Sequence, residues 1–194
     1  MISLKIFMVQ RPSVNKSGID GYITLLLVII TGAIGVLTGE EAPDLIQIEE
    51  NGFKFLVDIR KGQKTGFFLD QRDSRSLLSS LARDKTILNC FAYSGAFAAY
   101  ALRGGARQVI SVESSRPALE LAKQNLALNN LSLSESDLLK ADAFSYLKRC
   151  EPEFDIIVLD PPSLAVKRGD VKAAAGGYKF LNLHALRALK PAGL

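Results

Sequence analysis

The sequence predicts an α/β protein with an incomplete, Rossmann-like, doubly wound parallel sheet, preceded by a β-hairpin. Two observations lead to this fold class. From residue 86 onward, short apolar runs alternate with segments of helical periodicity, and strands separated by helices form right-handed βαβ units. Before that point, turn residues at 61–66 separate two strand-like segments. The composition, 48% hydrophobic and 23% charged, is that of a globular protein.

Residues 1–45 are expected to be an irregular N-terminal segment. It contains an uncharged run from Tyr22 to Thr38. This run is short for a membrane span, which needs about 20 apolar residues, and Gly32 and Gly35 interrupt it. A signal peptide fits poorly, because basic residues and a long segment precede the run. We interpret it as a buried strand and expect no membrane association, with a membrane or signal segment as the alternative.

Residues 46–72 are expected to form the β-hairpin segment. Asn51-Gly52 is typical of a tight turn, 53–59 alternates like a strand, and 67–69 is expected to be the returning strand, with basic residues at the tip between them. Residues 51–85 carry eight basic and four acidic groups, the densest basic excess in the chain. Such an excess suits contact with phosphates, although on charge alone we favour a solvated surface.

Residues 73–194 are assigned to the sheet domain. Helices are expected over 72–83, 94–102, 116–129, 143–149 and 178–189, and strands at 86–90, 108–112, 138–139 and 154–159. The run Pro191 to Leu194 resembles the lead-in to a fifth strand. We therefore expect a truncated domain whose strand at 154–159 is left as an unpaired edge.

The first motif that carries chemistry is Asn89-Cys90-Phe91-Ala92-Tyr93-Ser94-Gly95, between the first strand of the sheet and the following helix. Gly95 has no side chain to obstruct a ligand. The helix that follows offers unpaired N–H groups to an anionic group. We expect this loop to bind a cofactor through Asn89, Phe91, Tyr93, Ser94 and Gly95.

Two acidic positions extend this site. Glu113 ends the second strand and can accept hydrogen bonds from both ribose hydroxyls of a nucleoside cofactor. Asp142, followed by Ala143, comes after the third strand and can accept from an adenine amino group. The Gly-x-Gly-x-x-Gly pattern that a pyrophosphate needs is absent around Gly95. S-adenosylmethionine (SAM) has no pyrophosphate, so SAM is the cofactor that these residues favour.

Asp160-Pro161-Pro162 follows the fourth strand, at the carboxyl edge of the sheet, where doubly wound folds place their ligands. Two consecutive prolines make a rigid loop. This loop would aim Asp160 at a substrate that enters beside the sulfonium of SAM. We expect Asp160, Pro161 and Pro162 to be the catalytic residues of this chain.

From residue 47 to 194 the chain resembles the class I SAM-dependent family that makes 5-methylcytosine in bacterial 23S ribosomal RNA. The motifs that carry the resemblance are Val57-Asp58, the run from Gly62 to Arg72, the run from Asn89 to Gly95, Asp160-Pro161-Pro162 and Gly177-Tyr178-Lys179. The run from Gly62 to Arg72 is the most specific of them. The resemblance implies a cytoplasmic enzyme with ribosomal RNA as partner. It also implies that Gln71 and Arg72 contact the cofactor and that Lys61 and Lys64 contact RNA.

The departures from this family concern both ends of its usual chain. Members begin with a PUA RNA-binding domain, which residues 1–30 do not resemble, and carry a catalytic cysteine beyond the fifth strand. Cys90 and Cys150 do not fit that nucleophilic role. With two isolated cysteines and His184 as the single histidine, no metal site is expected either. We expect cofactor binding without turnover, and the sequence leaves the oligomeric state open.

Three other functions remain open. A guanine-N2 methyltransferase of ribosomal RNA would also use Asp-Pro-Pro, usually followed by an aromatic residue that stacks on the flipped base. Here Ser163 follows, which favours methylation of carbon. The second alternative is an inactive remnant that binds nothing. The third is an NAD-dependent enzyme, which would bind a nicotinamide cofactor in place of SAM.

Overall fold

The computed structural model describes residues 6–10, 22–26, 43–63, 66–165 and 170–194. Its centre is a four-stranded parallel sheet of order β7-β6-β5-β8. The strands are β5 (Thr86–Cys90), β6 (Gln108–Glu113), β7 (Leu138–Lys140) and β8 (Ile156–Leu159). The strand order reverses beside β5, as in a doubly wound sheet. The predicted α/β fold class is therefore confirmed.

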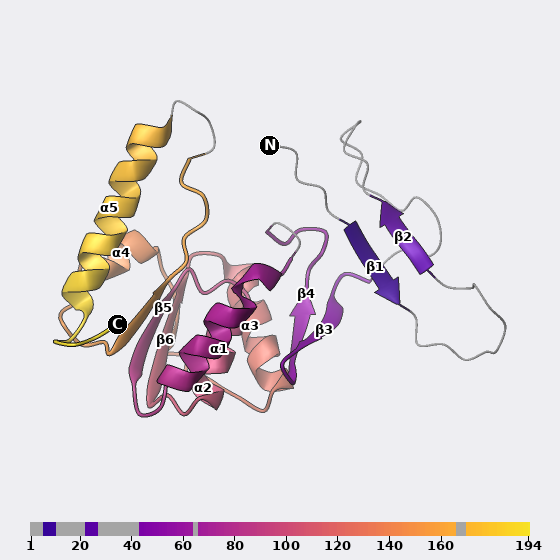
Figure 1. Ribbon diagram of the computed structural model, residues 1–194, viewed down its shortest axis with the longest axis horizontal. Coiled ribbons are helices and arrows are strands. Elements are labelled where there is room, and N and C mark those ends of the chain that lie inside the picture. The colour runs from indigo at the N-terminus through magenta and orange to yellow at the C-terminus, as the bar shows by residue number, and fades with distance from the viewer. Residues whose placement is uncertain (1–5, 11–21, 27–42, 64–65, 166–169) are drawn as a thin grey trace.

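Helices cover both faces of this sheet (Figure 1). They are α1 (Arg72–Leu81), α2 (Ala96–Arg103), α3 (Arg116–Leu128), α4 (Ala143–Leu147) and α5 (Val171–Ala188). Successive side chains of a strand point to opposite faces. Ile87 accordingly packs with the alanines of α2, whereas Leu88 packs with Leu147 of α4 and Leu181 of α5. The sheet is thus buried on both faces, which explains why its strands have continuous apolar runs.

Helix α5 begins seven residues earlier than the sequence predicts, at Val171 instead of Tyr178. The pair Gly176-Gly177 disfavours a helix by propensity. Packing explains Gly177: a Cβ there would lie 2.9 Å from Cδ1 of Leu164. A tertiary contact therefore requires a residue that local propensity penalises.

The hairpin is formed by β3 (Ile46–Glu50) and β4 (Phe53–Val57), which pair antiparallel around Asn51-Gly52. Both turn residues have positive φ, 50° and 75°, as a two-residue hairpin turn requires. The predicted returning strand at 67–69 was wrong. Leu69–Gln71 is instead a 3-10 helix, η1, and Phe67 is buried because its ring packs 5.0 Å from that of Phe55.

Two further strands lie in the segment that was expected to be irregular. β1 (Ile6–Gln10) and β2 (Tyr22–Leu26) pair antiparallel, so the prediction for 1–45 was wrong at these positions. β2 agrees with a strand for the start of the uncharged run, while 27–38 lies outside the described residues. Within the described part of the chain, no helix is long and apolar enough to cross a membrane.

The outer side of β8 is not left unpaired, contrary to the prediction. Phe154 forms a parallel bridge with Leu189, and the Lys190 amide donates to the Phe154 carbonyl at 2.9 Å. The Leu194 amide donates to the Asp155 carbonyl, and the Ile157 amide donates to the Leu194 carbonyl, both at 2.9 Å. Residues 189–194 therefore satisfy part of the backbone edge next to β8.

Candidate functional site

A cavity of about 680 Å³ lies at the carboxyl end of the sheet, the edge where doubly wound folds bind ligands. It brings together eight of the predicted site residues, which come from η1, from the loop after β5 and from the ends of β6 and β8. They are Gln71, Phe91, Tyr93, Ser94, Glu113, Asp160, Pro161 and Pro162. Residues from segments up to 91 positions apart thus meet in one cleft.

The loop after β5 has an unusual backbone. Phe91, Tyr93 and Gly95 all have positive φ, 57°, 46° and 78°. Positive φ is uncommon for residues other than glycine and is concentrated at functional sites. The alternation turns the chain tightly between β5 and α2, so that Phe91, Tyr93 and Ser94 line the cleft.

Gly95 is not among the residues that line the cavity, and its packing explains why this position is a glycine. It is the N-cap of α2, and a Cβ there would lie 2.8 Å from Cβ of Ala122. The missing side chain leaves room for helix α3, and direct contact of Gly95 with the cofactor stays a prediction. Gly95 thus lets the loop after β5 pack closely against α3.

Asn89 also lies behind the cleft and does not line it. Its side chain is 1% exposed, on β5, in register with the buried Ser111 of β6. Within the described residues, Nδ2 of Asn89 and Oγ of Ser111 have no hydrogen-bond partner. Buried polar groups normally find a partner, often an ordered water. Asn89 therefore belongs to a small polar region inside the sheet, beneath the loop.

Glu113 holds two loops at the rim of the cleft. Its Oε2 accepts from the Tyr93 amide at 3.0 Å, and its Oε1 accepts from the Ser115 amide at 2.8 Å. The Ser114 hydroxyl adds a bond to Oε1 at 3.3 Å. A carboxylate has about four acceptor positions and three are occupied here, so Glu113 retains capacity for about one ligand hydroxyl. These bonds also fix the direction in which the carboxylate points.

Tyr93 joins this loop to the segment that follows the hairpin. Its hydroxyl accepts from the Gln63 amide at 3.0 Å and donates to the Gly66 carbonyl at 3.2 Å. Burial raises the pKa of the Tyr93 phenol above its ordinary value, so the group stays protonated and able to donate. A Cβ at Gly62 would lie 2.8 Å from this hydroxyl, which explains the glycine there.

Asp142 and Ala143 do not line the cavity. Asp142 is the N-cap of α4, where its Oδ1 accepts from the Ser145 amide at 2.8 Å. The next residue, Phe144, packs edge-on against Phe91 of the cleft, with ring centroids 6.3 Å apart. The two residues therefore lie behind the Phe91 side of the site, and Asp142 already has a structural role.

Asp160, Pro161 and Pro162 form the opposite rim, after β8. Nε2 of Gln71 lies 3.5 Å from Oδ1 of Asp160, so an amide and a carboxylate meet across the cleft. Arg72, by contrast, is exposed, lies outside the cleft and pairs with Asp73 at 3.5 Å. Lys61 is likewise exposed and outside the lining, and Lys64 lies outside the described residues.

The cleft also contains residues that the site prediction missed: Gln63, Phe67, Phe68, Arg75, Ala92, Ala96, Phe97, Ser114, Ser163 and Tyr178. Gln63, Phe67, Phe68 and Tyr178 belong to the runs that carry the family resemblance, so the motifs could have indicated them. Arg75 and Phe97 have no local signal in the sequence, because only the tertiary fold brings α1 and α2 to the cleft.

Neither cysteine lines the cleft. Burial raises the pKa of the Cys90 thiol to about 12 and that of Cys150 to about 11. Thiols with such values stay protonated at neutral pH and are poor nucleophiles. Among the described residues, no cluster of histidine, cysteine and carboxylate side chains could hold a metal ion.

Comparison with known proteins gives consistent results. Residues 30–186 match the family model described as S-adenosylmethionine-dependent methyltransferase. Two relatives named Ribosomal RNA large subunit methyltransferase I, from Cronobacter sakazakii and Pseudoalteromonas translucida, are 47% and 48% identical over 84% and 82% of this chain. The chain spans only 42% and 41% of their lengths.

The solved structures agree with this relationship. The crystal structure of SMU.776, a methyltransferase in complex with SAH (S-adenosylhomocysteine), superimposes on this chain with a TM-score of 0.70 and 35% sequence identity. The match covers 81% of this chain and 42% of that one. The family match spans most of the chain, and the cleft lies where the ligand of such a fold is expected. The chain therefore belongs to the S-adenosylmethionine-dependent methyltransferase family.

Proposed function

We propose that the cleft binds SAM and that the chain provides the cofactor-binding part of a methyltransferase that acts on a base of 23S ribosomal RNA in the cytoplasm. The observation that carries the proposal is that Glu113 and Asp160 line one cavity from the ends of two strands that flank β5. Both carboxylates suit a cationic sulfonium cofactor with ribose hydroxyls.

The cleft fits SAM in size and in its polar groups. Ligand cavities are typically about 300–1,000 Å³, and this one has about 680 Å³. Glu113 would accept from the ribose hydroxyls, and the loop with Phe91, Tyr93 and Ser94 would hold the methionine part. Asp142, through its second carboxylate oxygen, would accept from the adenine amino group after a small shift of the Phe91–Phe144 pair. When bound, SAM supplies an electrophilic methyl group.

The target base would enter between Asp160 and α5. Pro161, Pro162, Ser163 and Tyr178 line this side, and the Tyr178 hydroxyl accepts from the Leu164 amide at 3.4 Å. Asp160, oriented by Gln71, would accept from an N–H group of the base. Lys61 and Lys64 would meet RNA phosphates outside the cleft. Cytosine C5 is the proposed target, because the motifs resemble the family that makes 5-methylcytosine. The relatives named Ribosomal RNA large subunit methyltransferase I support ribosomal RNA as the substrate.

The cofactor proposal is tested by calorimetric titration of the wild-type protein and of Glu113→Ala with S-adenosylhomocysteine (SAH). We expect the variant to bind at least about tenfold more weakly, because a hydrogen bond to a charged group contributes about 1.5–3 kcal/mol. Glu120→Ala, on the exposed side of α3, is the matched control and should bind like wild type. Equal affinity for wild type and Glu113→Ala would remove Glu113 from the site, and binding of NADH instead of SAH would refute the cofactor.

The substrate proposal is tested by incubating the protein with unmodified 23S ribosomal RNA and methyl-labelled SAM, followed by analysis of the nucleosides. We expect no labelled nucleoside from this chain, because neither cysteine lines the cleft and burial keeps both thiols protonated. Labelled 5-methylcytidine would show that the chain methylates cytosine C5 without a cysteine in the cleft. Labelled N2-methylguanosine would instead identify a guanine-N2 methyltransferase. Absence of any labelled nucleoside agrees with a chain that provides only the cofactor-binding part, and the calorimetric titration then decides whether the cofactor binds.

A further inference from the structure

Arg75 is a charged side chain buried in the wall of the cleft. It lies on α1, is 2% exposed and lines the cavity. Its Nε donates to Oε1 of Glu50 at 2.9 Å, and its Nη2 donates to Oε2 at 2.8 Å. Glu50 is the last residue of β3 and is itself 7% exposed. The pair thus connects the hairpin to the cleft with two parallel bonds, a geometry specific to arginine.

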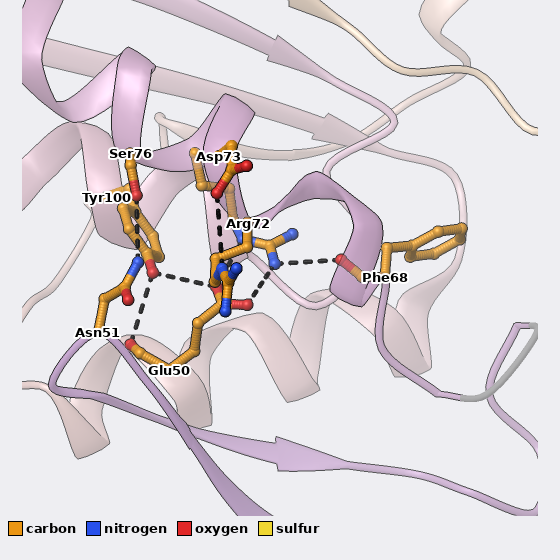
Figure 2. Close-up of polar contacts among 8 residues, drawn as sticks. Glu50, Asn51, Phe68, Arg72, Asp73, Ser76 and Tyr100 are labelled. Atoms are coloured by element: carbon orange, nitrogen blue, oxygen red, sulfur yellow. Dashed lines mark hydrogen bonds and ion pairs between the residues drawn. The ribbon is translucent and has the colours of Figure 1, made fainter. Parts of the chain in front are cut away.

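Further hydrogen bonds surround the Glu50 carboxylate and its partner Arg75 (Figure 2). The hydroxyl of Tyr100 on α2 donates to Oε1 of Glu50 at 3.0 Å. Nη2 of Arg75 also donates to the carbonyl of Phe68 at 3.1 Å, and the guanidinium lies 4.7 Å from the ring centre of Phe67. One guanidinium therefore contacts the hairpin carboxylate and two successive residues of the cleft wall.

The Phe68 carbonyl leads from Arg75 to the far side of the cleft. It also accepts from the Gln71 amide at 3.1 Å, and this bond closes the turn of η1. Gln71 in turn reaches Oδ1 of Asp160 at 3.5 Å. The Phe68 ring packs edge-on against Tyr93, with centroids 5.8 Å apart. Arg75 is thus linked, through Phe68, to both loops that carry the proposed site.

We propose that Arg75, oriented by Glu50, is a positioning residue: it holds Phe68 and Gln71 as the cleft wall that faces Tyr93 and Asp160, and so sets the affinity for the cofactor. The inference rests on the proposed binding of SAM. A buried ion pair contributes little net stability, because desolvation offsets most of the attraction. Its geometry, however, fixes where the Phe68 carbonyl lies, and through it the turn that carries Gln71.

If Arg75 only anchored the hairpin, any substitution that loosens the hairpin would weaken cofactor binding to a similar extent. The chain offers a matched control in Arg103 of α2. Arg103 also anchors the hairpin: its Nη1 donates to the Gly52 carbonyl at 3.1 Å, and its guanidinium lies 3.5 Å from the ring centre of Phe53. It does not line the cleft. Substitution of Arg103 weakens the anchoring of the hairpin without touching the wall.

The test is calorimetric titration with SAH of wild type, Arg75→Lys, Arg75→Gln, Glu50→Gln and Arg103→Gln, at a temperature where circular dichroism shows each protein folded. Lysine keeps the charge but cannot bond to both Glu50 oxygens and to the Phe68 carbonyl in the arginine geometry. We expect at least about tenfold weaker binding for the Arg75 and Glu50 variants and a change below about twofold for Arg103→Gln. If Arg75→Gln does not fold, Arg75→Lys decides.

A spectroscopic readout reports on the wall itself. The chain has no tryptophan, so Phe68→Trp introduces a single fluorophore at the cleft. Adding Arg75→Lys to this variant should shift its emission to the red and lower its anisotropy, whereas adding Arg103→Gln should change neither. Folded Arg75 variants that bind SAH like wild type, with unchanged emission, would overturn the inference. Failure of wild type to bind SAH would instead overturn the proposed function, and this inference with it.

Discussion

Asn125 of α3 bonds to both backbone polar groups of Leu56 in β4. Its Oδ1 accepts from the Leu56 amide at 2.6 Å, and its Nδ2 donates to the Leu56 carbonyl at 3.3 Å and to the Ser94 carbonyl at 3.0 Å. The side chain is fully buried. One amide thus occupies the place of a neighbouring strand on the outer side of β4 and ties the hairpin to the loop that lines the cleft.

We expect Asn125→Ala to lower the free energy of unfolding by about 2–4 kcal/mol, because the part-buried amide and carbonyl of Leu56 and the buried Ser94 carbonyl all lose their bond to Asn125. Urea denaturation of both proteins measures this loss. Asn129→Ala is the matched control: Asn129 bonds to Lys54 in the same way, but at a more exposed position, so its loss should be smaller. Equal losses for the two variants would contradict the assignment.

Gly95→Ala should destabilise the protein by about 2–3 kcal/mol, because alanine disfavours the observed φ of 78° and its Cβ would lie 2.8 Å from that of Ala122. Adding Ala122→Gly removes the steric part and leaves the backbone strain. Thermal unfolding of both single variants and the double variant should therefore show less destabilisation in the double variant than the sum of the two. Strict additivity would mean that the two residues do not collide.

Gly176→Ala should stabilise the protein by about 0.5–1 kcal/mol, since alanine favours the helix and a Cβ at this position meets nothing within 4 Å. The measurement is again the shift in melting temperature. Gly177→Ala, one position further, gains the same propensity but must displace Leu164, so its gain should be smaller or reversed. A decrease for Gly176→Ala would argue against a continuous α5.

Asp155 makes the stability depend on pH in acid. The bond from the Thr86 amide at 2.8 Å, and then Lys190 at 3.2 Å, lower the pKa of this carboxyl in the native state. Its contribution is therefore present above the unfolded pKa of about 3.9 and is lost as the pH falls through the lower native value. Asp155→Asn should be less stable at neutral pH, and the difference from wild type should narrow in acid.

The cysteines should be unreactive in the native protein. Burial, and secondarily the charge of Glu153, raise the pKa of Cys150 from 9.0 to about 11, which reduces the thiolate fraction at neutral pH about 100-fold. Alkylation by iodoacetamide, followed by mass spectrometry, should therefore be much slower in the native state than in urea. Rapid modification of Cys90 without urea would contradict its burial, and rapid modification of the partly exposed Cys150 would contradict its raised pKa.

The sheet was predictable because its strands are buried on both faces and its helices have a clear period, so β5 and β6 lie within a residue of the expected bounds. The hairpin was only half predictable. Phe67 and Phe68 are as apolar as a strand, but aromatic packing and the bond from Arg75 hold them, and no strand pairs with them. Apolar patterning indicates burial without indicating which backbone partner is present.

The lining of the cleft was predictable at the carboxyl ends of the strands, as at Glu113 and Asp160. It was not predictable at Arg75, whose charge would normally indicate an exposed helix face. Its partner Glu50 lies 25 positions earlier in the chain, and nothing local links the two. Arg72 shows the converse: the motif suggested a cofactor contact, whereas its position on α1 directs it to solvent beside Asp73.

The hairpin and the parallel sheet share one hydrophobic core, so they should unfold together. Phe53, Phe55 and Val57 of β4 pack in one cluster with Ile87 of β5 and Val109 of β6. The hairpin therefore cannot separate from the sheet without exposing this hydrophobic core to water. Backbone amides of β4 and β5 should exchange with deuterium in a single cooperative event, and cutting the chain between residues 72 and 73 would leave neither piece with a closed interior.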